Sequence, residues 1–250
     1  MTAFKIMSYN IHSGIGMDGV FDMDRIAGVI RQAGTDMVGL QEADVHWGPR
    51  SRFGHTVEEL AQALGMFYYA APVYDLPPQR EGEPNRQFGV AVLSRFPIVR
   101  AANHRLTRLS TQDREAPPTP MPGFAEAVLD VVGTVVTVYV THLDYRPDPA
   151  LRLLQVTEML DIVGDSSGKL LLGDFNAGPK APELERLFER FGDTWSIRGS
   201  DPGLTFPADE PRSKIDYILA GDGLQVTETS VIESLASDHR PIVASIRLEL

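Results

Sequence analysis

The chain has 250 residues, no cysteine and a formal net charge of −11 at pH 7, and 43% of its residues are hydrophobic. This length and apolar content predict a globular protein with a substantial buried core. The lack of cysteine excludes disulfides, thiolate metal ligands and cysteine nucleophiles. The acidic balance argues against a broad basic surface for nucleic acid, although a cation held by clustered carboxylates would still attract phosphate locally.

No stretch of the sequence predicts a membrane anchor. The amino terminus lacks a charged start followed by a long apolar run, and no later apolar run reaches membrane-spanning length. We therefore expect no stable membrane insertion and a cytoplasmic location.

A strand is expected over residues 4–8, and it leads to Asn10. The glycines of residues 14–19 then match the G-x-G-x-x-G pattern of dinucleotide-binding proteins. In those proteins the glycines join a strand directly to a helix, whereas here polar residues intervene and the next helix follows residue 24. We interpret the segment as a flexible loop, keep a dinucleotide-binding protein as a remote alternative, and expect no nucleotide cofactor.

The next elements follow from hydrophobic periodicity. Apolar residues spaced for a helix follow residue 24, and a short strand over residues 37–40 leads to Glu42. Thr56 and Glu59 form a capping-box pattern that opens a helix over residues 56–64. Three strands are expected after it, at residues 66–71, 88–94 and 96–99. Residues 107–123 contain too many prolines for a helix or an interior strand, so we expect a surface loop there.

A hairpin is expected over residues 124–131 and 134–140, and it leads to His142. A helix over residues 151–163 should turn Leu153, Val156, Leu160 and Val163 inward, and a buried strand over residues 169–172 should lead to Asp174. The remaining expected elements are a helix at 183–191 and strands at 215–219, 226–232 and 241–248. The sequence has no internal repeat, and we expect one domain over residues 1–250.

Polar side chains recur where the predicted strands end. They are Asn10, Glu42, His142, Asp174 with Asn176, and Asp238 with His239, while Asp216 lies within an apolar strand. Each has an ordinary alternative, such as a turn, a cap, a rim histidine or a solvent-facing strand position. Asp174 and Asn176 would share one face of an extended segment. Together these residues indicate one shared site.

Such a set suits the hydrolysis of a phosphate ester. Carboxylates such as Glu42 and Asp238 are the hard oxygen ligands that Mg²⁺ prefers. A histidine held by a buried aspartate can stay protonated and stabilise the reacting phosphorus centre, while a second carboxylate accepts a proton from water.

The chain resembles the endonuclease/exonuclease/phosphatase superfamily, the DNase-like fold. The matching segments run in the family's order from residue 9 to residue 241: residues 9–12, 40–42, 91–98, 141–143, 173–176, 215–218 and 237–241. The resemblance implies an α/β fold, a four-layer sandwich of two packed mixed β-sheets flanked by helices. It also implies a divalent-metal-dependent phosphoesterase that uses Mg²⁺ or Mn²⁺.

The resemblance also implies a role for each polar residue. Glu42, with Asn10 and Asp238, would hold the metal, and His239 would be the catalytic histidine oriented by Asp216. Asp174 would align or deprotonate the attacking water. His142 would contact the phosphate or act on the acid side, Asn176 would bind a phosphoryl oxygen, and Arg114 matches a phosphate-binding arginine of some members. Val90 departs from the family pattern, in which many members carry a polar residue.

Nucleic acid is the substrate expected from the resemblance, cleaved by a phosphodiesterase of the endonuclease or exonuclease type. The alternatives are a phosphodiesterase for sphingomyelin-type phospholipids and a phosphatase for inositol phosphates. A catalytically silent interaction domain is a further alternative, but buried unpaired carboxylates are costly to keep without a cation or a partner.

Overall fold

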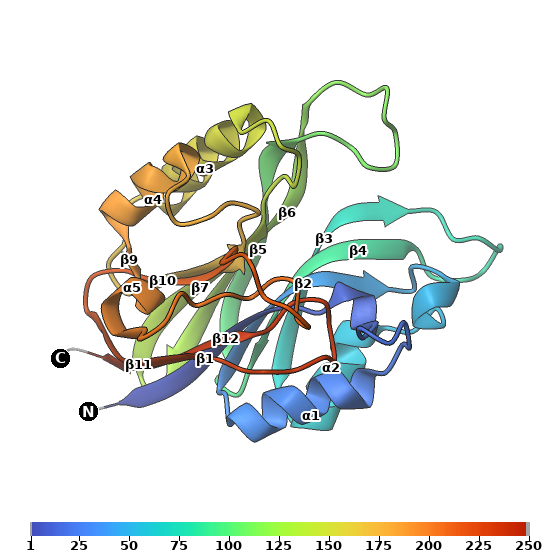
Figure 1. The fold of residues 1–250 in the computed structure, drawn as a ribbon. Coiled ribbons are helices and arrows are strands. Elements are labelled where there is room, and N and C mark those ends of the chain that lie inside the picture. Colours follow the sequence, from blue (N-terminus) through green and yellow to red (C-terminus); the bar gives the residue numbers. More distant parts are fainter. Residues whose placement is uncertain (1, 249–250) are drawn as a thin grey trace.

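The structure is a computed structural model, and it describes residues 2–248. Two six-stranded β-sheets packed face to face form its centre (Figure 1). The first sheet has the strand order β11-β12-β1-β2-β4-β3. Its strands are β1 (Ala3–Asn10), β2 (Met37–Val45), β3 (Phe67–Leu76), β4 (Arg86–Ser94), β11 (Leu224–Val231) and β12 (Ile242–Leu248). Strands β1 and β2 are parallel, whereas β12 runs antiparallel to β1.

The second sheet has the order β5-β6-β7-β8-β10-β9. Its strands are β5 (Ile98–Arg108), β6 (Thr119–Val131), β7 (Thr134–His142), β8 (Lys169–Asp174), β9 (Gly192–Asp193) and β10 (Asp216–Ala220). Here β7 and β8 are parallel, and β10 runs antiparallel to β8. Each sheet therefore mixes parallel and antiparallel pairs, as expected.

Helices cover the outer faces of both sheets (Figure 1). The helices α1 (Met23–Ala33) and α2 (Thr56–Leu64) pack on the first sheet, and α3 (Ala150–Val163) and α4 (Glu185–Arg190) pack on the second. The short helix α5 (Thr194–Arg198) contacts β10 and β11. Short 3-10 helices lie at His12–Gly14, Pro49–Ser51 and Pro182–Leu184. The predicted four-layer α/β sandwich is confirmed. Within residues 2–248, no helix combines the length and apolar character needed to cross a bilayer.

Three hydrophobic cores hold these layers together. The largest lies between the sheets and takes residues from both, including Ile6 of β1, Val138 of β7 and Leu172 of β8. The other two lie between each sheet and its own helices. The central core thus belongs to both sheets and packs them against each other.

The proline-rich segment differs from the prediction. Strand β5 continues to Arg108 and β6 begins at Thr119, so part of the expected loop is paired strand. Pro120 of β6 pairs with Thr107 of β5, but the pairing of β6 with β7 begins only at Ala125. The first part of β6 is thus a sheet edge, where proline removes no hydrogen bond to a second neighbour.

Helix α3 also differs in its inward face. Leu153, expected inside, is 47% exposed, while Arg152 and Gln155 are buried. Arg152 bonds Glu183 Oε1 through Nε at 2.9 Å and Nη2 at 2.8 Å, and Gln155 Nε2 donates to Thr107 O at 3.0 Å. The inward face of α3 therefore includes two polar side chains that bond neighbouring elements, and Leu153 is left outside it.

The glycine-rich segment does not form the strand-to-helix turn of a dinucleotide-binding site. Ile15 bridges to Phe21 in antiparallel fashion, and Gly16 N–H donates to Val20 O at 3.1 Å. Helix α1 begins only after Asp22, whose side chain accepts from the Arg25 N–H. The segment is a small hairpin-like loop, in line with the expectation that the motif match is false.

Topology brings the predicted site residues to one edge of the sandwich. The parallel strands β1 and β2, and likewise β7 and β8, present their carboxyl ends there. Strands β10 and β12 run the opposite way, so the same edge receives the start of β10 and the turn before β12. This arrangement gathers side chains that are up to 229 positions apart, from Asn10 to His239.

We predict that Gly39→Ala destabilises the protein through the contact between the sheets. A Cβ atom on Gly39 of β2 would lie 2.8 Å from Val140 Cγ2 and 3.2 Å from Leu172 Cδ2, both in the second sheet. Overpacking of this kind lowers the free energy of unfolding by roughly 1–3 kcal/mol. Urea unfolding measures it.

Gly28→Ala is the matched control, since a Cβ there in α1 meets nothing within 4 Å. It should leave stability unchanged or raise it by up to about 1 kcal/mol. A Gly39→Ala variant as stable as wild type would contradict the close approach of the sheets.

Candidate active site

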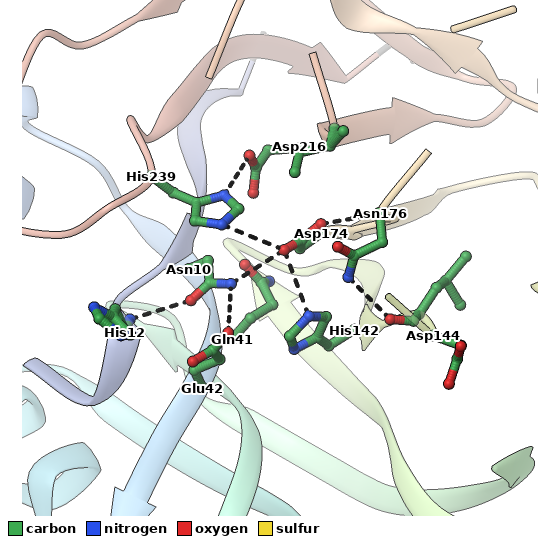
Figure 2. A network of polar contacts seen from close by, with 12 residues as sticks. Asn10, His12, Gln41, Glu42, His142, Asp144, Asp174, Asn176, Asp216 and His239 are labelled. Atoms are coloured by element: carbon green, nitrogen blue, oxygen red, sulfur yellow. Dashed lines mark hydrogen bonds and ion pairs between the residues drawn. The ribbon is translucent and has the colours of Figure 1, made fainter. Parts of the chain in front are cut away.

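The carboxylate of Asp174, the last residue of β8, is the centre of a polar network at this edge (Figure 2). Its Oδ2 accepts a hydrogen bond from Asn10 Nδ2 at 3.1 Å. The same oxygen lies 3.4 Å from His142 Nε2 and 3.6 Å from His239 Nε2. Asn10 ends β1 in the first sheet, so the network joins the two sheets at their common edge.

Glu42 reaches this network because β2 is irregular. The pairing of β2 with β4 shifts between Leu40 and Ala43, and Glu42 has a φ of 57°. A bulge of this kind redirects a side chain from the normal alternation of a strand. Glu42 Oε1 accepts from Asn10 Nδ2 at 3.1 Å, and Asn10 Oδ1 accepts from His12 N–H at 3.1 Å. The backbone N–H therefore fixes the Asn10 amide with its nitrogen toward both carboxylates.

His239 and Asp216 form a buried pair. His239 Nδ1 donates to Asp216 Oδ2 at 2.8 Å, and the two residues are 5% and 1% exposed. Burial alone would lower the pKa of His239, but Asp216 through its charge and hydrogen bond, then Asp174 and Asp238, raise it from 6.5 to about 10. The imidazole is therefore protonated at neutral pH, and its Nε2–H faces Asp174.

Asp174 is a more basic carboxylate than an exposed one. Burial, and then the charge of Asp216, raises the pKa of Asp174, while His142 and His239 act in the opposite direction. A carboxylate with a raised pKa is a better proton acceptor at neutral pH. His142 ends β7 and is the partly exposed member of the set, so it faces the open side of the network.

Asn176 does not share an extended segment with Asp174, contrary to the geometry expected from their spacing. Asn176 has a φ of 50°, and its backbone N–H donates to Asp174 Oδ1 at 2.9 Å. Its side-chain Nδ2 donates to Leu143 O at 3.0 Å (Figure 2). A left-handed turn therefore brings the amide beside the loop that follows His142, and one of its two N–H groups remains for another acceptor.

Asp238 lies at the same edge, on the side of the first sheet. Its Oδ1 is 3.8 Å from His12 Nδ1 and 3.3 Å from Ser237 Oγ, and Ser237 Oγ donates to Asn10 O at 2.7 Å. The side chain of Asp238 is 30% exposed. Neither Glu42 nor Asn10 touches the Asp238 carboxylate among the contacts of residues 2–248.

The donor set fits a hard divalent cation. Four carboxylates, Glu42, Asp174, Asp216 and Asp238, converge on this edge, and the protonated His239 offsets only part of their charge. Glu42 and Asp238 are the partly exposed members with oxygen atoms open to an ion. A second group of donor atoms, on Asp174, Asp216 and His239, lies within 4.8 Å, but a protonated histidine offers no lone pair to a metal.

Arg114 is exposed in the loop between β5 and β6, and no hydrogen bond or ion pair of the described residues joins it to the site. Its role in phosphate binding stays a prediction. Arg108, which the sequence analysis did not select, lies next to His142 instead, and its Nη1 donates to His142 O at 2.8 Å. No motif marks Arg108, because it falls in the part of β5 that the prolines had assigned to a loop.

We predict that the metal-free protein loses stability as pH rises from 6.5 to about 10. The folded state keeps a proton on His239 that the unfolded chain releases near 6.5, so this contribution is complete below pH 6.5 and is lost as pH approaches 10. The slope from one such group is roughly 1.4 kcal/mol per pH unit. Urea unfolding in EDTA at pH 7, 8.5 and 10 measures it.

His239→Gln removes the titrating group and should flatten this part of the pH dependence. Parallel curves for the variant and the wild type would show that His239 is not the group that holds the proton.

Comparisons with known proteins identify the family of the chain. The sequence profile of the Endonuclease/Exonuclease/phosphatase family matches residues 7–239. Protein cwh43 of Schizosaccharomyces pombe is 30% identical over 182 residues, which are 73% of this chain and 17% of that protein. The chain thus spans about a sixth of the length of the curated relative it matches.

Solved structures resemble the whole sandwich. An endonuclease/exonuclease/phosphatase from Beutenbergia cavernae is 26% identical with a TM-score of 0.81, over 99% of this chain and 72% of that one. The human nocturnin catalytic domain, with a bound sulfate anion, is 20% identical with a TM-score of 0.72, over 99% and 94% of the two chains. The chain belongs to the Endonuclease/Exonuclease/phosphatase family of phosphoester hydrolases.

Proposed function

We propose that this chain is a Mg²⁺- or Mn²⁺-dependent phosphodiesterase whose substrate is nucleic acid. The observation that carries the proposal is the single oxygen of Asp174, which lies 3.4 Å and 3.6 Å from two histidines. Such an arrangement pairs a proton acceptor with adjacent proton donors, which hydrolysis of a phosphate ester requires. The active site and both sheets then form one catalytic domain.

Asp174 accepts the proton of the attacking water. Its buried position raises the pKa of the carboxyl, and Asn10 Nδ2 holds Oδ2 at 3.1 Å. Proton transfer to a positioned carboxylate lowers the barrier for water to attack phosphorus. The bond to the leaving oxygen then breaks, and that oxygen takes up a proton from the acid side of the site.

His239 stabilises the charge of the reacting phosphoryl group. Asp216 orients its ring through Nδ1 and keeps it protonated, which leaves Nε2–H free for a phosphoryl oxygen. His142 lies on the open side of Asp174 and contacts the same group or the leaving oxygen. The free N–H of Asn176 Nδ2 serves a further phosphoryl oxygen.

Glu42 and Asp238 hold the cation, and Asn10 orients Glu42 through its amide nitrogen. When bound, a divalent cation neutralises charge on the phosphoryl group and on the leaving oxygen. The oxygen-rich donor set favours Mg²⁺ or Mn²⁺ over metals that prefer nitrogen and sulfur ligands. Ligation by Asn10 Oδ1 would require the amide to release the His12 N–H.

Aromatic rings at the wall of a pocket that His142 also lines, with an arginine packed on them, support a nucleic-acid substrate. Trp47 packs against Tyr74 and Phe88 at centroid distances of 6.0 Å and 5.6 Å. The guanidinium group of Arg86, which pairs with no carboxylate among the described residues, lies 5.9 Å from the Trp47 ring. Stacked aromatic and arginine surfaces bind bases and phosphates without requiring a broadly basic protein.

A phospholipid diester is the second candidate. Tyr145, three residues after His142, is 62% exposed, and an exposed aromatic ring at the rim of a site suits a lipid surface as well. Supercoiled plasmid, single-stranded DNA, RNA, sphingomyelin vesicles and inositol phosphates, each with Mg²⁺ or Mn²⁺, form the deciding panel. Turnover of sphingomyelin alone would replace the nucleic-acid proposal.

Asp174→Asn should lower kcat by about 10²–10⁴-fold and change KM by less than about threefold, since the amide keeps the shape but accepts no proton. Release of nitrophenolate from bis(p-nitrophenyl) phosphate measures both constants. Asp161→Asn, an exposed change on α3, is the matched control and should match wild type. A large rise in KM with kcat preserved would mean that Asp174 binds substrate instead.

Glu42→Gln should weaken the activating effect of Mg²⁺ or Mn²⁺ and leave the fold intact, because Asn10 Nδ2 can still donate to the amide oxygen. Calorimetric titration of each metal should give at least about tenfold weaker binding in the variant, the loss of one charged ligand. Equal metal affinity in both proteins would exclude Glu42 as a ligand.

A further inference from the structure

A pocket opens beside the catalytic network, on the side of His142. Its wall comes from β3, β4, β5, the start of β6 and the loop before α3. Most of the lining is apolar or aromatic, including Val90 and Tyr145. His142 belongs both to the pocket wall and to the network around Asp174, so the pocket borders the network. A group attached to the reacting phosphate is therefore the part of a substrate that lies next to the pocket.

One basic side chain in this pocket is unusual. Arg108, the last residue of β5, donates from Nη1 to His142 O at 2.8 Å and from Nη2 to Gly123 O at 3.0 Å. Its Nε is buried and has no hydrogen-bond partner among the described residues. Two of its five N–H groups are thus used, and both bond neutral carbonyl oxygens.

No carboxylate neutralises Arg108 directly. It forms no ion pair within residues 2–248, and the nearby acids have other partners. Asp144 pairs with Arg146, and Glu158 accepts from the backbone N–H and the hydroxyl of Thr107 at 2.7 Å and 2.6 Å. Burial lowers the pKa of Arg108 to about 10, so the guanidinium keeps its charge at neutral pH.

A half-buried cation without a counter-ion is costly where its Nε is shielded from water, and a ligand anion would reduce that cost. The positive charge of Arg108 contrasts with the rest of the protein, because the chain as a whole carries a net charge of −11. Positive charge concentrated at one pocket of an acidic protein selects an anionic group rather than attracting polyanions generally.

We propose that the Arg108 pocket is a subsite for a terminal anionic group of the substrate, a phosphate monoester or a carboxylate, carried on the arm next to the reacting phosphoester. Residues of β3, β4, β5 and the loop before α3 line the pocket on several sides of the guanidinium, and such a space accepts the end of a short arm. The proposal rests on the phosphoesterase reaction at Asp174 and adds recognition of substrate ends.

The test uses three matched p-nitrophenyl phosphodiesters. Their second ester arm is a short alkyl chain that ends in a phosphate, a carboxylate or a hydroxyl group, and each releases nitrophenolate. The readout is the kcat/KM ratio of each anionic substrate to the hydroxyl substrate. For wild type with Mg²⁺ or Mn²⁺ at least one ratio should be about ten or more, the worth of one charge-assisted hydrogen bond.

Variants locate the preference within the pocket. Arg108→Gln should bring the ratio close to one, and Arg108→Lys should keep part of it. Leu109→Asp places a carboxylate in the same pocket lining and should lower the ratio even if Arg108→Gln does not fold. Arg105→Gln is the matched control, since this arginine of β5 is exposed and its Nη1 donates to Pro120 O at 3.0 Å, away from the pocket lining. It should keep the wild-type ratio.

The outcomes separate the two proposals. Larger turnover of the phosphate or of the carboxylate substrate identifies the anion. Wild-type ratios near one, with the hydroxyl substrate hydrolysed, overturn the subsite and leave the phosphodiesterase intact. A preference that Arg105→Gln abolishes as fully as Arg108→Gln also overturns it. Failure to hydrolyse any of the three overturns the phosphodiesterase and the subsite together.

Discussion

The carboxylate of Asp174 imposes the main constraint on this molecule. It is 1% exposed, and a buried carboxylate needs partners that replace its lost hydration. Asn10 comes from one sheet, while His142 comes from a neighbouring strand and His239 from the turn before β12. The partners reach Asp174 only if the two sheets pack with these strand ends at one edge. Packing and chemistry are therefore linked at a single oxygen atom.

Irregular backbone at two residues orients side chains that a regular strand would point elsewhere. Glu42 and Asn176 both have positive φ values, a costly conformation for residues other than glycine that persists when the surroundings favour it. In β2 this conformation directs a carboxylate toward Asn10, and after β8 it folds an amide back toward Asp174. Asp44, two residues beyond Glu42, is buried and accepts hydrogen bonds from the Ser13 hydroxyl and from Arg50. These bonds hold the end of β2 next to the bulge at Glu42. Two of the residues with strained backbone thus aim their side chains into the site.

Much of the fold and the site could be predicted from the sequence. The positions of the polar residues at strand ends were sufficient to predict that these residues meet, because parallel strands bring their carboxyl ends together. Helix α2 has the predicted bounds. What failed depended on tertiary contacts. Arg152 and Gln155 face inward while Leu153 is exposed, since these polar groups bond Glu183 and Thr107, which are distant in sequence. Arg108 was missed because its importance comes from a pocket and an unpaired charge, which no local pattern encodes.

The pocket and the network together describe a site with two unequal halves. Around Asp174 the charge is negative and suited to a cation, and around Arg108 it is positive and suited to an anion. His142 lies between them, with its side chain toward Asp174 and its carbonyl oxygen bonded to Arg108. A substrate that bridges both halves would place one phosphoester at the metal and another negative group in the pocket.

A crystal structure with Mn²⁺ and phosphate tests the central claim most directly, because anomalous scattering locates the ion independently of the protein atoms. The account predicts an ion bound to Glu42 and Asp238, with a phosphate within hydrogen-bond reach of Asn176, His142 and His239. An ion bound by Asp174, Asp216 and His239 instead would contradict it, since His239 would then be a neutral ligand and not the protonated partner of Asp216.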